Sequence, residues 1–263
     1  MAQGRQIAVV IPAFNEATTL PDIVQRSVAF ADQVWVVDDG SDDGTAEILA
    51  NLPCRSIVQP SNSGKGASLR TGLIAALADN PDAIVTLDAD GQHEPEAIPE
   101  LVSEFETSGA DLVIAARILR RKTMPALRRF GNRFADFWLG LAGRCHVRDS
   151  QSGFRLYSTQ LLQSLPIKGI AGERFDFEGR LLIESCRRGF PLAEVAIPAS
   201  YPPAGMASHY RPFWDTARIV GMVTNQILSR GLSTIKSGLL GLLQLSPRKK
   251  ASSGQSPSKP AKY

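Results

Sequence analysis

Short apolar runs alternate with longer amphipathic stretches through the first 116 residues, and this alternation limits the possible folds more than any other feature. Runs rich in Val, Ile, Leu and Ala are typical of buried strands, and the stretches between them have the apolar spacing of helices. Apolar strands separated by helices form parallel sheets with helices on both faces. We therefore predict an α/β fold with a mostly parallel, Rossmann-like sheet. The expected strands are 7–11, 34–37, 55–58, 83–87 and 111–116, and the expected helices are 18–30, 43–52, 66–78 and 94–105.

A polar, glycine-rich or acidic loop follows each of the first four expected strands. The loops have the sequences PAFNE (12–16), DDGSDDGT (38–45), PSNSGKG (60–66) and DADGQH (88–93). Ligands of parallel α/β sheets bind beyond the carboxyl ends of the strands. Four such loops in succession therefore predict one shared binding site at this edge of the sheet.

The loop DADGQH places Asp88, Asp90 and Gln92 at alternate positions, so that their side chains can point to one side. Carboxylate and amide oxygens are ligands that Mg²⁺ and Mn²⁺ prefer. A cation held there would neutralise a diphosphate. The alternative interpretation is an acidic turn that only precedes a helix.

The residues after this set have simpler interpretations. Glu94 and Glu96 are expected to start the next helix, because acidic side chains stabilise a helix N-terminus through its dipole. His93 is expected to be a hydrogen-bonding loop residue, with metal binding as the alternative.

The two middle loops indicate nucleotide binding. Asp38 and Asp39 end a strand and could accept hydrogen bonds from a base or a ribose, although a turn with a helix cap is the alternative. Lys65 lies at the start of a helix, where it and the backbone amides can approach a phosphate. The loop is not a P-loop, because the motif needs Ser or Thr after the lysine and Gly66 stands there.

Charge divides the chain into two halves. Residues 1–116 carry 18 Asp and Glu against five Lys and Arg, whereas residues 117–263 carry eight against 24. An acidic half suits metal ions, and a basic half suits phosphates or an anionic membrane surface. Nucleic acid is not expected as a partner, because the chain has no named nucleic-acid-binding motif.

The basic half opens with seven Lys or Arg between 117 and 133, followed by apolar residues at helical spacing. This pattern predicts a basic amphipathic helix. The apolar stripe faces the core in one interpretation and a membrane surface or lipid phosphate in the other. A second such helix is expected from Pro212 to Gly231, and the Ser-, Pro- and Lys-rich end of the chain is expected to be disordered. The stripe of the first helix consists of Leu127, Phe130, Phe134, Phe137, Trp138 and Leu141.

The cysteines and the apolar segments bear on the compartment. Cys54, Cys145 and Cys186 are widely spaced and odd in number, so we expect no disulfide, small apolar packing roles and a reducing compartment. The N-terminal apolar run is too short for a signal peptide, and no stretch reaches the ~18 to 20 apolar residues of a membrane span.

In this order and spacing, VVIPAFNE, VVDDGSDDGT, NSGKGASLRTGL and TLDADGQHEPE resemble the family 2 glycosyltransferases with the GT-A fold. RDSQSGFRLYS (148–158) resembles the D..sGFR segment of the polyprenol-phosphate branch, which includes the dolichol-phosphate mannose synthases. The resemblance covers roughly residues 7–230. It implies a GT-A domain over 1–230, with a nucleotide-binding half (1–116) and an acceptor-side half (117–230), followed by a short amphipathic segment and basic tail at 231–263.

The resemblance also implies roles for single residues. The expected catalytic residues are Asp90, Arg117, Asp176 and Glu178, with capping of the first turn of a helix as the alternative for Asp176 and Glu178. The expected ligands of the nucleotide sugar are Pro12, Asn15, Glu16, Asp38, Asp39, Lys65 and Asp88. The expected ligands of Mg²⁺ or Mn²⁺ are Asp88, Asp90 and Gln92. The expected ligands of the acceptor phosphate are Arg117, Arg128, Arg133, Arg155, His209 and Arg211.

The implied activity is an inverting, metal-dependent transfer of a hexose from a UDP- or GDP-sugar to a polyprenyl phosphate. Members of the family with two C-terminal transmembrane helices exist, and this chain lacks such segments, so a peripheral protein on the cytoplasmic face of the membrane is expected. One alternative is a family 2 transferase with a hydroxylated lipid or saccharide acceptor. A sugar-phosphate nucleotidyltransferase lacks support, because its Gly-rich, Arg- and Lys-containing signature is missing. A nucleotide-binding module without catalysis stays open.

Overall fold

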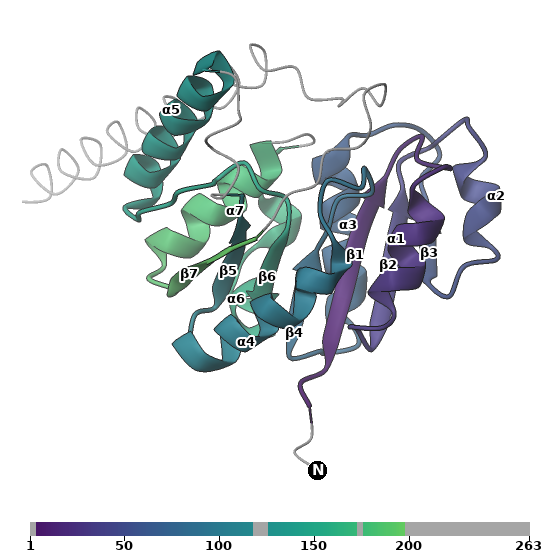
Figure 1. The fold of residues 1–263 in the computed structure, drawn as a ribbon, viewed down its shortest axis with the longest axis horizontal. Helices are drawn as coiled ribbons and strands as arrows, with labels where there is room; N and C mark the ends of the chain where they lie inside the picture. The colour runs from purple at the N-terminus through teal and green to yellow at the C-terminus, as the bar shows by residue number, and fades with distance from the viewer. Residues whose placement is uncertain (1–3, 118–125, 173–175, 198–263) are drawn as a thin grey trace, which may run out of the picture. The chain divides into compact units, whose positions relative to one another are not determined.

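A seven-stranded sheet forms the centre of the protein, in the order β3-β2-β1-β4-β6-β5-β7 (Figure 1). The computed structural model describes residues 4–117, 126–172 and 176–197, with side chains in the second range from residue 133 onward. β6 runs antiparallel to β4 and β5, and the other neighbouring strands are parallel. The α/β fold with a mostly parallel sheet is therefore confirmed. The strands are β1 Ile7–Ala13, β2 Gln33–Asp38, β3 Arg55–Val58, β4 Ala83–Thr86, β5 Leu112–Ala116, β6 Arg155–Ser158 and β7 Leu192–Ala196.

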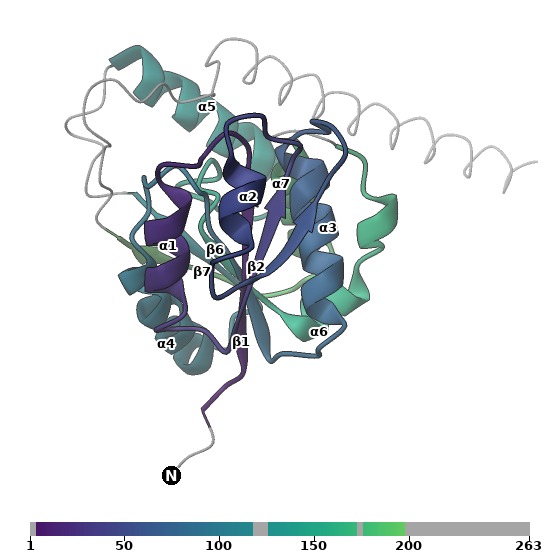
Figure 2. The same ribbon diagram turned by 90° about the vertical axis from the view of Figure 1, so that its right-hand side faces the viewer.

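Helices cover both faces of the sheet (Figure 2). Val9 and Ile11 of β1 belong to a core cluster with α1, α2 and α4, whereas Ala8 and Val10 belong to a second cluster with α3, α6 and α7. Alternate residues of a strand point to opposite faces, so an apolar run fills both clusters. The helices are α1 Leu20–Ser27, α2 Thr45–Leu49, α3 Lys65–Leu77, α4 Ile98–Ser108, α5 Ala126–Gly143, α6 Thr159–Ser164 and α7 Asp176–Arg187, with 3₁₀ turns η1 Pro95–Ala97 and η3 Ile167–Gly169.

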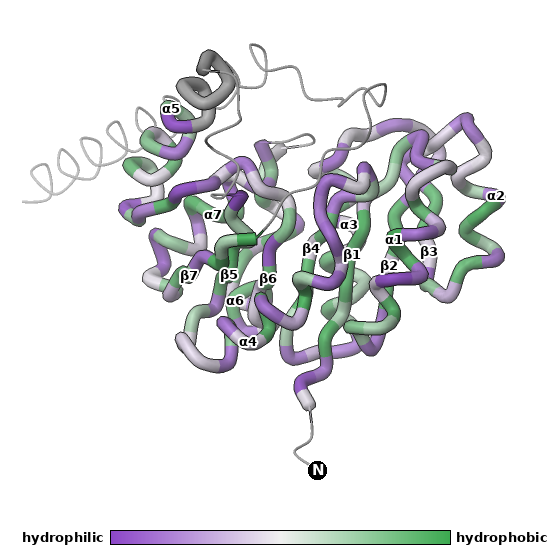
Figure 3. The backbone as a smooth tube through the Cα atoms, in the orientation of Figure 1, coloured by the Kyte–Doolittle hydropathy of each residue, from purple (hydrophilic) through white to green (hydrophobic). Residues whose placement is uncertain are grey.

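The strands are largely apolar, and the loops at their carboxyl ends are polar (Figure 3). Helix α3 approaches β1 and β2 closely because Gly72 faces Val10 and Val37, where a side chain would overlap. This packing brings the N-terminus of α3, and with it Lys65, to the carboxyl edge of the sheet.

Strand β6 is an element that the sequence pattern did not reveal. It is only four residues long, and it contains Arg155 and Tyr157, both fully buried. Because β6 is antiparallel, its first residue Arg155 lies opposite Thr86, the last residue of β4. The loop before β6 therefore meets the carboxyl ends of β4 and β5.

Helix α5 confirms the predicted basic helix, but three residues of its predicted apolar stripe do not face the core. The buried side of α5 contains Ala135, Leu139 and Ala142, which pack against Ile183 of α7. Large apolar side chains occupy the other side: Phe134 is 36% exposed, Phe137 63% and Leu141 53%. The core-facing interpretation is therefore wrong for these three residues.

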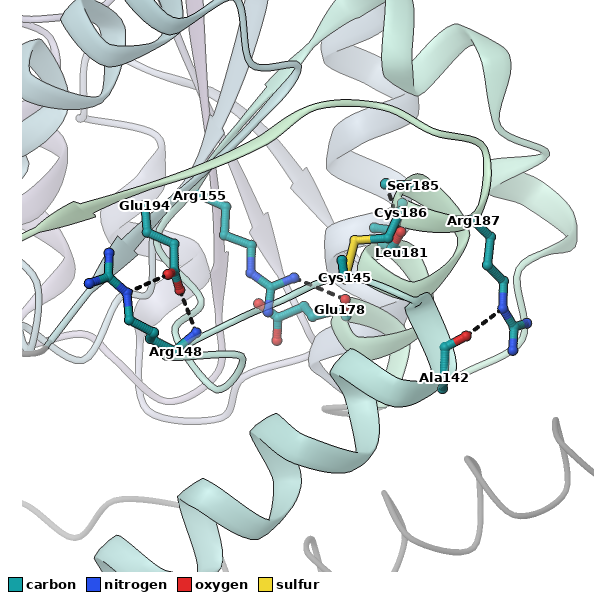
Figure 4. The surroundings of a disulfide bond; sticks show 10 residues. All are labelled: Ala142, Cys145, Arg148, Arg155, Glu178, Leu181, Ser185, Cys186, Arg187 and Glu194. Carbon is teal, nitrogen blue, oxygen red and sulfur yellow. Dashed lines mark hydrogen bonds and ion pairs between the residues drawn. A yellow bond between two sulfur atoms is a disulfide. The ribbon is translucent and has the colours of Figure 1, made fainter.

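Cys145 and Cys186 form a disulfide that ties the chain just after α5 to α7 (Figure 4). Gly143 makes room for the bond, because a Cβ there would lie 3.0 Å from Cys145 Sγ and 3.2 Å from Cys186 Cβ. Arg187 Nε donates to the Ala142 carbonyl at 2.7 Å beside it. The prediction of no disulfide is therefore wrong. The expected reducing compartment is no longer supported by the cysteines. Cys54 is a half-buried free thiol.

Within the described ranges, no helix is long and apolar enough to cross a membrane. The second basic helix, expected from Pro212 to Gly231, and the tail after it lie outside the described residues.

Candidate active site

The four polar loops after β1, β2, β3 and β4, here called the loop cluster, hydrogen-bond to one another. Asn15 joins the first two loops, since its amide donates to Ser41 Oγ at 2.9 Å and its Oδ1 accepts from the Asp42 amide at 3.0 Å. Thr19, in the turn before α1, donates to the Ala89 carbonyl of the fourth loop at 2.8 Å. The predicted meeting of these loops at one edge of the sheet is confirmed.

Asp38 and Asp39 differ in how many of their carboxylate oxygens accept a hydrogen bond within the protein. Asp39 accepts from the Ser63 amide at 2.9 Å and from the Gly64 amide at 2.7 Å, and so fixes the backbone before Lys65. Asp38 is fully buried, and its Oδ1 accepts from Ser41. Its Oδ2 has no hydrogen-bond partner among the described residues. A buried acceptor of this kind suits a donor group brought by a ligand.

Lys65 bridges two carboxylates from distant parts of the chain. Its Nζ lies 2.6 Å from Asp88 Oδ1 after β4 and 3.1 Å from Glu178 Oε2 in α7. Burial lowers the pKa of the Lys65 ammonium, but the charges of Asp88 and Glu178 outweigh this and hold the pKa above its ordinary value. Burial alone would raise the pKa of Asp88, yet the charge of Lys65 holds it below its ordinary value. Both groups are therefore charged.

Gly153 packs directly on the pair of Lys65 and Asp88. A Cβ at this position would lie 2.7 Å from Asp88 Oδ2 and 2.8 Å from Lys65 Nζ. The loop that carries Gly153 is held in place by Thr86 Oγ1, which donates to the Gly153 carbonyl at 2.8 Å. The bare backbone is thus what allows Asp88 to occupy its place.

Asp90 and Gln92 form the other half of the predicted metal set. Asp90 accepts from the Gln92 amide at 3.0 Å and from Gln92 Nε2 at 2.7 Å. Burial and the charge of Asp88 raise the pKa of Asp90.

No cluster of three His, Cys, Asp or Glu able to hold a metal occurs among the described residues. The two aspartates nevertheless fit Mg²⁺ or Mn²⁺, because Mg²⁺ is commonly bound by one or two carboxylates together with substrate phosphates. Burial first and the charge of Asp88 second raise the pKa of Asp90, and a bound cation would favour the ionised form of this carboxyl.

Glu16 and Pro12 lie at the end of β1. Burial raises the pKa of Glu16 to about 7; a hydrogen bond from Thr19 lowers it, and the charge of Asp90 adds to the rise. Pro12 is buried in β1 opposite Val37 of β2. Glu16 therefore titrates near neutral pH at the border of the acidic loop.

Arg117 follows β5 and is oriented by Asp149. The Arg117 amide, Nε and Nη2 all donate to this carboxylate, at 2.9, 2.8 and 2.9 Å. Glu194 of β7 fixes the loop before β6 in turn, since it accepts from the Arg148 amide at 2.7 Å and from Arg148 Nε at 2.8 Å. Strand β7 therefore positions the Arg117 guanidinium.

His93 belongs to the same loop as Asp88 and Asp90, and it is buried near the ion pair of Arg117 and Asp149. Its ring lies 5.4 Å from that of Phe154, and its Nδ1 has no hydrogen-bond partner among the described residues. Burial lowers the pKa of His93 to about 4. The expectation of a hydrogen-bonding loop residue does not agree with this buried, neutral ring.

Arg155 contradicts its predicted role as a ligand of the acceptor phosphate. It is 1% exposed, and its Nε and Nη2 donate to the carbonyls of Ser152 and Ser150, both at 2.8 Å. Its Nη1 donates to the carbonyl of Glu178 at 2.9 Å (Figure 4). A phosphate cannot reach a guanidinium enclosed in this way. Arg155 instead ties the loop before β6 to α7.

The remaining predicted residues fall into two groups. Asp176 is the first residue of α7 and pairs with Arg180 at 3.4 Å, and Arg133 is exposed on α5. Arg128 belongs to α5, but its side chain lies outside the described part of the structure. His209 and Arg211 lie outside the described residues altogether.

Glu94 and Glu96 lie at the start of a helix as expected, Glu94 as the N-cap residue of η1 and Glu96 in its first turn, but their carboxylates also pair with a distant cation. Both accept from the Arg26 guanidinium of α1, with Glu96 Oε1 at 2.8 Å from Arg26 Nε. Glu94 is the residue before η1, and its side chain makes no capping hydrogen bond. A cation on α1, which local sequence does not bring near, competes with the helix amides for these carboxylates.

Comparison with known proteins agrees with this geometry. The sequence model of the family described as Glycosyl transferase family 2 matches residues 8–165, more than half of the chain. A polyprenol monophosphomannose synthase of Mycolicibacterium smegmatis is 31% identical over 204 residues, which cover 72% of this chain and 75% of the relative.

Two further comparisons cover most of the chain. A UDP-N-acetylglucosamine–dolichyl-phosphate N-acetylglucosaminyltransferase of Methanococcus voltae is 30% identical, over 76% of this chain and 88% of the relative. The crystal structure of glucosyl-3-phosphoglycerate synthase from Mycobacterium tuberculosis with Mn²⁺, UDP and phosphoglyceric acid has a TM-score of 0.62 and 26% identity, and covers 86% of this chain and 78% of that one.

The fold and the site together define a glycosyltransferase with the GT-A fold. The chain belongs to glycosyltransferase family 2, and it resembles that family's polyprenol-phosphate branch.

Proposed function

We propose that the protein transfers a hexosyl group from a UDP- or GDP-sugar to a polyprenyl phosphate at a membrane surface, with inversion at the anomeric carbon. The observation that carries the proposal is the half-buried aspartate pair Asp88 and Asp90 at the carboxyl edge of the sheet, in a chain whose relatives include a polyprenol monophosphomannose synthase. A crystal structure with 26% identity contains Mn²⁺ and UDP, which supports a nucleotide diphosphate at this edge.

The loop cluster supports donor binding. Asp38 keeps a buried oxygen without a partner for a base or ribose, and Asn15, Glu16 and Asp39 lie in the loops around it. Asp88 and Asp90 would hold Mg²⁺ or Mn²⁺, with Gln92 beside them, and the bound cation would stabilise the leaving diphosphate.

The lipid acceptor requires a cation for its phosphate rather than a strong base. The guanidinium of Arg117 is held by Asp149 at the end of β5, and such a preorganised group suits a phosphate. In the transfer, an oxygen of the lipid phosphate bonds to the anomeric carbon while the bond from that carbon to the donor diphosphate breaks. A phosphate monoester is anionic near neutral pH, because its second pKa is about 6.

Helix α5 supports contact with a membrane surface. Phe134, Phe137 and Leu141 expose large apolar side chains on one side of a helix that also carries the exposed Arg133. Exposed apolar residues flanked by basic ones are typical of helices that lie in the interface of anionic membranes. Arg133 would then lie close to the lipid phosphate groups.

An assay of product partition tests the proposal. The purified full chain is incubated with Mn²⁺, a panel of labelled UDP- and GDP-sugars, and polyprenyl phosphate in detergent. We expect label in an organic-soluble product that mild acid cleaves, and loss of this product for Asp90→Ala. Glu100→Ala is the matched control, because Glu100 is an exposed carboxylate in the first turn of α4 and should leave transfer unchanged.

Other outcomes separate the acceptors. An acid-stable organic product would show a hydroxylated lipid instead of a lipid phosphate. Label transferred only to a water-soluble acceptor such as phosphoglycerate would overturn the lipid acceptor and keep the glycosyltransferase. Full transfer by Asp90→Ala would overturn the metal assignment.

A further inference from the structure

Lys65 places an ammonium group where a divalent cation is proposed to bind. The Nζ atom lies 2.6 Å from Asp88 Oδ1, within the range of a direct ion pair, and the Lys65 side chain is only 18% exposed. A divalent cation bound to Asp88 would therefore meet another cation at close range and without much water between them. In this environment two like charges repel each other strongly.

Glu178 offers the ammonium a second place. Its Oε2 already lies 3.1 Å from Lys65 Nζ, its side chain is 9% exposed, and its Oε1 has no hydrogen-bond partner among the described residues. A small rotation of the lysine side chain would strengthen this contact while it lengthens the contact to Asp88. The backbone at both ends is fixed, since Asp39 holds the amide of Gly64 and Arg155 Nη1 donates to the carbonyl of Glu178.

Gly153 lies directly beside the pair of Lys65 and Asp88. A Cβ at this position would lie 2.8 Å from Lys65 Nζ and 2.7 Å from Asp88 Oδ2, so the absence of a side chain is what allows the two groups to meet here. The loop before β6 carries no acidic side chain at this point, whereas α7 offers the carboxylate of Glu178.

We propose that Lys65 is an internal counter-ion of Asp88, which a divalent cation displaces, and that Glu178 receives the displaced ammonium. This inference rests on the metal site of the proposed function. It makes Lys65 and Glu178 positioning residues: the ammonium that they share with Asp88 holds this aspartate in its charged form in the absence of metal, and its displacement links arrival of the cation to α7.

The test measures Mn²⁺ binding to the nucleotide-free full chain, by following the electron paramagnetic resonance signal of free Mn²⁺. Lys65→Met removes the competing charge, so we expect Mn²⁺ affinity to rise about tenfold. Glu178→Gln removes the second place of the ammonium, so affinity should fall about fivefold. In the double variant the effect of Glu178→Gln should disappear, because no ammonium remains to be displaced.

Controls separate this inference from simpler explanations. Lys168→Met removes an exposed lysine of η3 and should not change Mn²⁺ affinity. Thermal unfolding followed by circular dichroism shows whether each variant is folded, and Glu178→Gln keeps both Lys65 and Asp88 if Lys65→Met is unstable.

Each outcome decides between the two proposals. Equal or weaker Mn²⁺ binding by Lys65→Met overturns the counter-ion, as does an effect of Glu178→Gln that persists in the double variant. If Asp90→Ala abolishes Mn²⁺ binding while Lys65→Met leaves it unchanged, the metal site stands and only the counter-ion fails. If no variant binds Mn²⁺, with or without UDP or GDP, both proposals fail.

Discussion

The loop cluster and the elements after β5 reach the same edge of the sheet by different means. Loops of the cluster are neighbours along the sheet, and their contacts are mostly hydrogen bonds between adjacent loops, such as those of Asn15 and Asp39. The later elements each contribute one group from far along the chain: Gly153 before β6 and Glu178 in α7.

This difference shows two ways in which one edge of the sheet is built. Hydrogen bonds among neighbouring loops hold the loop cluster together, and among the described residues Lys65 alone reaches from it to Glu178 of α7. The later elements depend on long-range ties, which include the Arg148–Glu194 and Arg117–Asp149 ion pairs and the Cys145–Cys186 disulfide. A substitution at the junction of the two regions should therefore affect activity more than a substitution within either.

Gly153→Ala gives the largest expected effect, because Gly153 lies at that junction. The added Cβ would lie 2.7 Å from Asp88 Oδ2 and 2.8 Å from Lys65 Nζ, so these side-chain ends must move. Side-chain ends can shift without unfolding, and a misplacement of about 1 Å at a reacting group costs about 100-fold in rate. We expect transfer to fall about 100-fold with little change in the unfolding temperature.

Gly169→Ala is the matched control for this prediction. Its nearest neighbour would be Pro166 Cβ at 4.0 Å, so activity should not change. Undiminished transfer by Gly153→Ala would show that Asp88 does not need its present place, and the two regions would then be less tightly coupled than the contacts indicate.

The same contrast explains what the sequence could and could not predict. All five strands of the first half, and the meeting of their loops, follow from local patterns that each segment carries by itself. The burial of Arg155 could not be predicted, because the carbonyls that satisfy it come from Ser150, Ser152 and Glu178 in the folded chain. Without these acceptors, an arginine in a short strand indicates an exposed segment.

Pairing of distant residues was invisible for the same reason. The Cys145–Cys186 disulfide depends on how α5 packs against α7, which spacing along the chain does not define. The partnership of Lys65 with Glu178 likewise needs α3 and α7 to lie on the same face of the sheet. Gly153 in the sequence QSGFR indicated that another group approaches the backbone closely at this position. The sequence did not indicate that this group is Asp88.

Phe137→Ser with Leu141→Ser should give the next largest effect, on membrane binding alone. Both side chains are more than half exposed on α5, so their loss should leave the core intact. Burying a Phe or Leu side chain contributes about 1.5–3 kcal/mol, so partition to vesicles of phosphatidylglycerol and phosphatidylcholine should weaken about tenfold or more. Cosedimentation measures this, and binding by the wild-type protein should weaken with salt.

Val58→Ser is the control, since Val58 is 54% exposed on β3 at the other edge of the sheet. It should leave vesicle binding unchanged. If the α5 variant binds vesicles as the wild-type protein does, the exposed side of α5 is not a membrane contact. The elements after β5 would then contribute to the site but not to membrane binding.

Glu16→Gln should give the smallest effect, and it tests whether the loop cluster stores unfavourable charge. Thr19 Oγ1 lies 2.7 Å from Glu16 Oε2 and 2.8 Å from the Ala89 carbonyl, and its single proton cannot serve both acceptors. A protonated Glu16 removes this conflict, in agreement with a pKa that burial raises to about 7. The folded chain therefore holds a proton that the unfolded chain loses at lower pH, and stability should fall as pH rises from 4.5 through 7. Because Glu16 is only half-buried, solvent screening reduces this loss of stability. We expect Glu16→Gln to unfold about 3 °C above the wild-type protein at pH 8.

At pH 4.5 and below, this difference in unfolding temperature should vanish. Glu47→Gln, an exposed carboxylate of α2, should show no such pH dependence, and an equal shift of Glu16→Gln at both pH values would mean that the loop cluster carries no charge strain at this position.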